Sequence, residues 1–101
     1  PVAVVLQTGA VTRIPVVDDP FRIGRDPGCD LCLWDLRISR RHARVWRDGS
    51  SFLIEDLGSS NGTILLSTVS DTLRLPPHQA HPLANGDRIR VGDTTLHFMI
   101  S

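Results

Sequence analysis

Short apolar runs recur about every ten residues along this 101-residue chain, and clusters of Gly, Pro, Asn and Asp separate them. The runs are rich in valine, isoleucine and leucine, as half-buried strands are. This spacing leaves no room for the helices that join parallel strands, so it favours antiparallel pairing. The pattern is typical of an all-β sandwich or barrel. It predicts strands at residues 2–7, 11–17, 21–24, 31–34, 42–47, 52–57, 63–66, 88–91 and 94–100.

Turn-forming residues between the runs indicate how the strands connect. Thr8-Gly9, Asp48-Gly49-Ser50 and Gly92-Asp93 predict tight hairpins. Two joints, at residues 26–28 and 35–41, are longer and polar. Because loops on a rigid scaffold often carry function, these joints are where we expect the chemistry.

The length of the chain suits one domain with a single core. It begins with Pro1, so we expect residues 1–101 to be a single domain excised from a longer protein. No apolar run approaches the roughly 20 residues that span a bilayer, and no basic, apolar leader opens the chain. Two cysteines, Cys29 and Cys32, are too few for a disulfide framework and fit a reducing, cytoplasmic setting.

The charged residues balance, with eleven basic and eleven acidic side chains. Formal neutrality argues against a nucleic-acid binder that relies on a strong overall field. All the basic residues are arginine, and five of them lie in residues 37–47, where no acid occurs. The planar guanidinium suits phosphate and carboxylate, although Arg44 and Arg47 are equally compatible with a solvated strand face.

Three turns between the apolar runs carry an arginine, a serine and an asparagine. They are Gly24-Arg25, then Ser39-Arg40-Arg41-His42, and then Gly58-Ser59-Ser60-Asn61-Gly62-Thr63. Hydrogen-bond donors on separate loops of a rigid scaffold can converge on one anion. The sequence therefore predicts a phosphate-reading surface.

Gly24-Arg25, Ser39-x-x-His42 and Asn61-Gly62, in this order and spacing, resemble the forkhead-associated (FHA) domain. The flanking residues 55–63 and the late run 83–89 share the resemblance, which covers nearly the whole chain. It implies an FHA-like β-sandwich of about eleven mostly antiparallel strands that binds phosphothreonine peptides in preference to phosphoserine ones.

The resemblance also implies roles for individual residues. Arg25 and Ser39 would bind the phosphate, and Arg40 would help through its backbone or guanidinium. Asn61 would hold the peptide main chain through its amide, and Ser60 would make a second contact, to the main chain or to the phosphate. A phosphothreonine carries nearly two negative charges and three strong acceptors, so an arginine and a hydroxyl suit it.

Other matched positions are implied to read the peptide sequence or to shape the loops. Arg37 falls where family members often read the residue three places after the phosphothreonine, which suggests an acidic or polar preference. The residues implied to structure the loops rather than touch the peptide are Gly24, His42, Asp56, Gly62 and Thr63.

One segment departs from the family pattern. After Thr63 the family often has a short strand and an Asn-Gly hairpin, whereas residues 67–82 here are longer and bear prolines. A short strand near Leu73 fits this segment. We interpret it as a passive surface insertion rather than as a determinant of peptide preference.

Ser39, His42 and Asp56 are the residue types of a hydrolase triad. However, the chain has no Gly-x-Ser-x-Gly elbow, and arginines beside Ser39 would bind an anion rather than assist attack. We therefore expect no enzymatic activity.

Metal, redox and nucleic-acid functions have weaker support. Cys29-x-x-Cys32 is half of a zinc site at most, and His78-x-x-His81 lies in the atypical segment. Cys32 alternates with leucines and is better explained as a small apolar side chain. Trp34 and Trp46 are too few aromatics for a nucleic-acid surface. We expect no cofactor, no metal, no nucleic-acid partner and no membrane partner.

The function that we predict is a phosphothreonine-dependent peptide-binding module in a kinase-linked assembly in the cytoplasm. The alternative is a scaffold whose sandwich faces bind a partner regardless of phosphorylation. The identity of the partner and the oligomeric state stay open.

Overall fold

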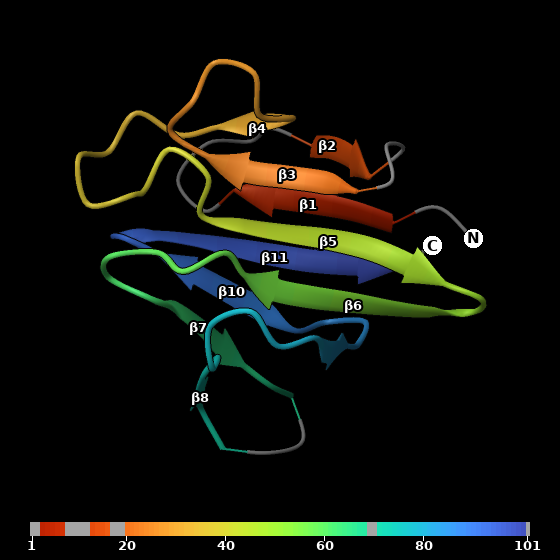
Figure 1. The fold of residues 1–101 in the computed structure, drawn as a ribbon. Coiled ribbons are helices and arrows are strands. Elements are labelled where there is room, and N and C mark those ends of the chain that lie inside the picture. Colours follow the sequence, from red (N-terminus) through yellow and green to blue (C-terminus); the bar gives the residue numbers. More distant parts are fainter. Residues whose placement is uncertain (1–2, 8–12, 17–19, 69–70, 101) are drawn as a thin grey trace.

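The computed structural model describes residues 3–7, 13–16, 20–68 and 71–100. These residues form eleven strands and no helix, so the predicted all-β class is confirmed (Figure 1). The strands are β1 (Ala3–Gln7), β2 (Arg13–Val16), β3 (Phe21–Gly24), β4 (Leu31–Cys32), β5 (Ala43–Asp48), β6 (Ser51–Asp56), β7 (Thr63–Leu66), β8 (Leu73–Arg74), β9 (His81–Leu83), β10 (Arg88–Val91) and β11 (Thr94–Ile100). In this part of the chain no helix has the length and apolar character needed to cross a membrane.

The strands form two sheets that face each other as a sandwich (Figure 1). One sheet has the order β2-β1-β11-β10-β7-β8, and the other has the order β4-β3-β5-β6-β9. The named pairs are antiparallel except β3 with β4, which runs parallel. The mostly antiparallel sandwich is therefore as predicted.

The core lies between the two sheets because apolar side chains alternate inward along the strands. Phe52 of β6 meets Phe98 of β11 edge-on, with ring centroids 5.2 Å apart, so this contact joins one sheet to the other. The buried apolar cluster contains Phe21, Ile23, Leu31, Leu33, Ile38, Val45, Phe52, Ile54, Leu65, Leu75, Leu83, Ile89, Val91, Leu96 and Phe98.

Two predicted hairpins are confirmed by the strand register. Asp48 pairs with Ser51 across the β5–β6 turn, and Val91 pairs with Thr94 across the β10–β11 turn. The predicted Thr8-Gly9 hairpin lies outside the described residues, as do residues 2, 11–12 and 17 of the first two predicted strands.

The strand predicted at residues 31–34 is shorter in the structure. β4 ends at Cys32, because the chain then folds into a turn in which Ile38 N–H donates to the Asp35 carbonyl oxygen (2.9 Å). This turn leaves the Trp34 side chain 81% exposed. The apolar run thus leaves the sheet before its end.

The segment 67–82 contains two strands. β8 is the short strand expected near Leu73, whereas β9 was not predicted. β9 contains Pro82, which normally argues against a strand. It is tolerated because β9 is an edge strand paired only with β6, with Pro82 opposite Leu53.

Candidate functional site

Three loops meet at one end of the sandwich: the β3–β4 loop (residues 25–30), the β4–β5 loop (33–42) and the β6–β7 loop (57–62) (Figure 1). The first two are joined by backbone hydrogen bonds. Arg25 N–H donates to the Ser39 carbonyl oxygen (3.0 Å), and Asp26 N–H donates to that of Arg40 (3.1 Å). A Cβ on Gly24 would lie 2.1 Å from the Arg40 carbonyl oxygen, so the two loops approach closely only because residue 24 is glycine.

The Arg25 side chain is oriented by the neighbouring loop. Its Nε donates to the Ile38 carbonyl oxygen at 3.0 Å. Its terminal Nη atoms make no hydrogen bond with a described residue. The guanidinium is thus fixed at one nitrogen and keeps donors for a ligand.

Ser39 lies between the β4–β5 and β6–β7 loops. Its Oγ accepts the backbone N–H of Ser60 at 3.0 Å, and its own N–H donates to Nδ1 of His42 at 3.1 Å. Because the hydroxyl oxygen already accepts, the O–H hydrogen stays available to an acceptor such as a phosphate oxygen.

His42 is fully buried beneath these loops. Because Nδ1 accepts from Ser39, the proton is on Nε2, which donates to the Gly62 carbonyl oxygen at 2.8 Å. The imidazole therefore ties the serine-bearing loop to the asparagine-bearing loop.

Asp56, at the end of β6, organises the β6–β7 loop from below. Its carboxylate accepts the N–H groups of Gly58 and Ser59 (both 3.0 Å), the Ser59 hydroxyl (2.5 Å) and the Thr63 hydroxyl (2.6 Å). The Ser59 Oγ in turn accepts Gly62 N–H at 3.0 Å. Burial alone would raise the pKa of Asp56, but these hydrogen bonds outweigh it and hold the pKa below its usual value.

Ser39, His42 and Asp56 do not form a catalytic triad. The ring of His42 contacts the backbone N–H of Ser39 rather than its hydroxyl, and the carboxylate of Asp56 bonds to its own loop rather than to the imidazole. The geometry is that of a loop support.

Asn61 is an exposed residue of the β6–β7 loop. Its Nδ2 donates to the Arg37 carbonyl oxygen at 2.8 Å, which leaves the amide oxygen without a described partner. The next residue, Gly62, has φ +85°, a conformation that favours glycine. A groove of about 350 Å³ adjoins Asn61, and it is lined by Arg37, Asn61, Gly62, Ile64, Arg90 and Gly92.

Arg37 was predicted to read the peptide, but its side chain is engaged within the protein. Its guanidinium pairs with Asp35 (Nε to Oδ1, 3.3 Å) and with Asp93. The backbone N–H of Arg37 is the main cause that lowers the pKa of Asp35, so this acid stays ionised. The positive charge of Arg37 is largely balanced by these two acids.

Sequence reasoning missed the two cysteine contacts. The thiol of Cys29 contacts the Arg40 carbonyl oxygen and that of Cys32 contacts the Arg25 carbonyl oxygen, both at 3.4 Å. Both cysteines are free, and burial raises the pKa of Cys29, so it stays a thiol donor. Cys29 lies in the β3–β4 loop and Cys32 ends β4, and no residue pattern in the sequence marks either contact.

No set of three or more metal-ligating side chains gathers anywhere in the described ranges.

The predicted Arg40 is exposed beside Ser39, and the predicted Arg25, Ser39, Ser60 and Asn61 lie on the three loops at the same end. The remaining predicted residues, Gly24, His42, Asp56, Gly62 and Thr63, lie beneath them.

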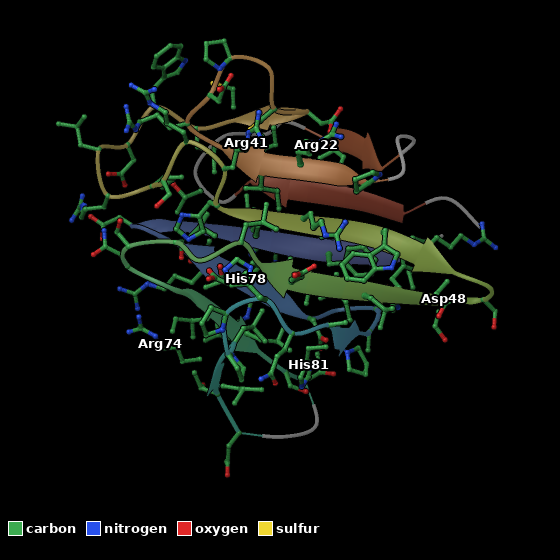
Figure 2. All side chains as sticks on the ribbon, in the orientation of Figure 1. Arg22, Arg41, Asp48, Arg74, His78 and His81 are labelled. Atoms are coloured by element: carbon green, nitrogen blue, oxygen red, sulfur yellow. The ribbon has the colours of Figure 1, made fainter. Side chains whose placement is uncertain are left out.

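Part of the atypical segment contacts the strand ends on either side of the β6–β7 loop, and its passive role stays a prediction. Leu75 N–H donates to the Thr63 carbonyl oxygen (2.9 Å), and His78 N–H donates to that of Asp56 (2.8 Å). The Arg74 guanidinium lies over Gly62, since a Cβ there would be 2.8 Å from its Cζ. Figure 2 shows Arg74 at the same end of the molecule as the loops.

Comparison with known proteins places this geometry in a family. The FHA domain family model matches residues 21–92. The chain is 38% identical over 95 residues to FhaB of Mycobacterium tuberculosis, covering 91% of this chain and 56% of FhaB. It is 37% identical over 90 residues to the oxoglutarate dehydrogenase inhibitor of Corynebacterium jeikeium, covering 89% of this chain and 57% of that protein. The chain thus spans about half the length of these curated relatives.

Solved structures with the same fold point to the same family. Mycobacterium tuberculosis EmbR, in complex with a low-affinity phosphopeptide, superposes with a TM-score of 0.87 at 32% identity, over 99% of this chain and 24% of EmbR. A structure from work on phosphothreonine-dependent FHA domain interactions gives 0.82 at 27% identity, over 100% of this chain and 98% of that one. With its family match, its relatives and its fold in agreement, the chain belongs to the FHA domain family.

Proposed function

We propose that this chain is a phosphothreonine-dependent peptide-binding module without enzymatic activity. The observation that carries the proposal is the pair formed by Arg25 and Ser39. Their backbones are hydrogen-bonded to each other across two loops, and each side chain keeps a donor free. A dianionic phosphate accepts such donors through short, charge-assisted hydrogen bonds.

Arg40 and Asn61 extend the proposed contact. Arg40 is exposed next to Ser39 and adds a second positive charge beside the phosphate. The unpaired amide oxygen of Asn61 can accept a peptide N–H, because its Nδ2 is already used to hold the loop. Ser60 contributes its side chain only, since its N–H is bound to Ser39.

The relatives support this assignment. EmbR was solved with a phosphopeptide, and FhaB is named for the same domain. Two or three charge-assisted hydrogen bonds, less the entropy of ordering a peptide, give an affinity of about micromolar. Such an affinity suits reversible, kinase-regulated assembly. The free cysteines support a reducing, cytoplasmic setting.

The test is a titration by fluorescence anisotropy with three versions of one peptide library: phosphothreonine, phosphoserine and unphosphorylated. We expect saturable binding only to the phosphothreonine version. Arg25→Ala should weaken it about tenfold or more, since it removes a charge-assisted hydrogen bond. Arg88→Ala is the matched control, because Arg88 is exposed on β10 and belongs to none of the three loops.

Thermal melts of each variant separate lost contacts from lost folding. A partner bound at full strength by Arg25→Ala, or binding that ignores phosphorylation, would favour the phosphorylation-independent scaffold instead.

A further inference from the structure

Two arginines flank one isoleucine on the outer face of the six-stranded sheet. In the register, Ile64 of β7 lies opposite Arg74 of β8 on one side and opposite Arg90 of β10 on the other. Directly opposed residues on antiparallel strands point to the same face. Arg74 and Arg90 are exposed, and Ile64 is half-buried, so the row presents an apolar centre between two cations.

This row borders the groove beside Asn61. Ile64 and Arg90 line the groove directly, together with Gly62. Arg74 reaches it from the other side, because its guanidinium packs against Gly62. The row and the proposed peptide-binding asparagine therefore belong to one continuous surface.

The two arginines that line the groove differ in whether an acid of the protein already pairs with them. Arg37 is balanced by Asp35 and Asp93. Arg90 has no ion pair or hydrogen bond from its side chain to a described residue, and no acidic residue occurs in β7, β8, β10 or β11. The unsatisfied positive charge in this groove thus belongs to Arg90, with Arg74 beside it.

We propose that Arg90, assisted by Arg74, binds an acidic side chain of the phosphorylated partner, next to the phosphothreonine. This inference rests on the proposed phosphothreonine-binding function. A carboxylate would accept from the planar guanidinium of Arg90, while the methylene groups of the same aspartate or glutamate would pack on Ile64. The partner is therefore a phosphothreonine segment with an acidic residue within a few positions of the phosphate.

The assignment moves acid recognition away from Arg37. A second carboxylate near Arg37 would meet the negative charges of Asp35 and Asp93, which already pair with its Nε and Nη2. Arg90 has no such ion pair with a described residue. The segment 67–82, which supplies Arg74, thereby becomes part of the specificity surface.

The test uses one phosphothreonine peptide in which a single glutamate is scanned through each position from four before to four after the phosphothreonine, with glutamine at the same position as the neutral partner. Dissociation constants are measured at fixed ionic strength for wild type, Arg90→Gln, Arg74→Gln and Arg88→Gln. Arg88 is the matched control, because it lies on the same strand and face as Arg90 but does not line the groove.

We expect one or two glutamate positions to bind wild type about fivefold more tightly than glutamine, the effect of a well-placed ion pair. Arg90→Gln should abolish this gain and Arg74→Gln should reduce it, where the gain is the ratio of the glutamine to the glutamate dissociation constant measured within the same variant. Arg88→Gln should keep the full gain.

The possible outcomes distinguish a failure of this inference from a failure of the proposed phosphothreonine-binding function. If no phosphopeptide binds, the proposed function fails and the inference falls with it. Phosphopeptides that bind wild type without any glutamate gain overturn this inference alone. A gain that survives in Arg90→Gln, or that Arg88→Gln removes equally, also overturns it, because the effect would then come from elsewhere or from the general field.

Discussion

The buried imidazole of His42 donates through Nε2 to the carbonyl oxygen of Gly62, twenty residues away, at 2.8 Å. The opposite ring nitrogen accepts the N–H of Ser39. One side chain thus sets the distance between the loop that carries the serine and the loop that carries the asparagine.

Replacing His42 with alanine should therefore loosen both loops at once. Each lost hydrogen bond leaves a backbone group at the site without its partner, so we expect a loss of about 2–4 kcal/mol in the free energy of unfolding. Denaturant unfolding measures this loss. The half-buried His81, whose ring hydrogen-bonds among the described residues to the adjacent Pro82 carbonyl, supplies the control: His81→Ala should cost less than about 1 kcal/mol. Equal losses for the two variants would contradict the bridging role.

A second prediction concerns Gly24, where the β3–β4 and β4–β5 loops approach closely. A Cβ there would overlap the Arg40 carbonyl oxygen at 2.1 Å, whereas on Gly28 the nearest atom would be the Asp26 Oδ1 at 3.2 Å. Gly24→Ala should displace the β4–β5 loop, destabilise the fold by about 1–3 kcal/mol and weaken phosphopeptide binding. Gly28→Ala should leave both nearly unchanged. Comparable phosphopeptide affinity for both variants, measured by anisotropy, would count against the steric argument.

The sequence was sufficient to predict the sandwich and the loops that carry Arg25, Ser39 and Asn61. The reason is that alternation and turn residues act locally, and the resemblance to the FHA domain implied which turns meet at one end. The pairing of Arg37 with Asp93 joins distant parts of the chain and has no local pattern.

The same limit explains the other misses. β9 contains a proline and exists because β6 offers it an edge, which is a tertiary effect. The position of Arg74 over Gly62 follows from the β7–β8 register rather than from its neighbours in sequence. The thiol contacts of Cys29 and Cys32 are weak and specific to the packed loops, so no residue pattern announces them.

These thiol contacts predict that the two cysteines support the loops without a metal. Both sulfurs face backbone carbonyls, and a structural zinc needs four ligands. We expect the melting temperature of the purified protein to be unchanged by excess chelator, and Cys32→Ser, which keeps a donor, to melt close to wild type. A melting temperature that falls on chelation, and recovers with zinc, would refute this role.

Asp56 makes the stability of the domain depend on pH. Because its pKa is lowered in the folded state, its contribution is fully present above its unfolded pKa of about 4 and is lost as the pH falls through the lower folded pKa. Thermal melts between pH 7 and pH 2 should therefore show a stability loss that begins near pH 4. Asp56→Asn cannot titrate, and it replaces one carboxylate oxygen with an NH2 donor, so either the Gly58 and Ser59 N–H groups or the Ser59 and Thr63 hydroxyls lose their acceptor. It should therefore be less stable at neutral pH and show a shallower acid loss. The exposed Asp71 offers the matched control, since Asp71→Asn should reproduce the wild-type profile. An acid profile that is identical in wild type and Asp56→Asn would show that other carboxylates govern the transition.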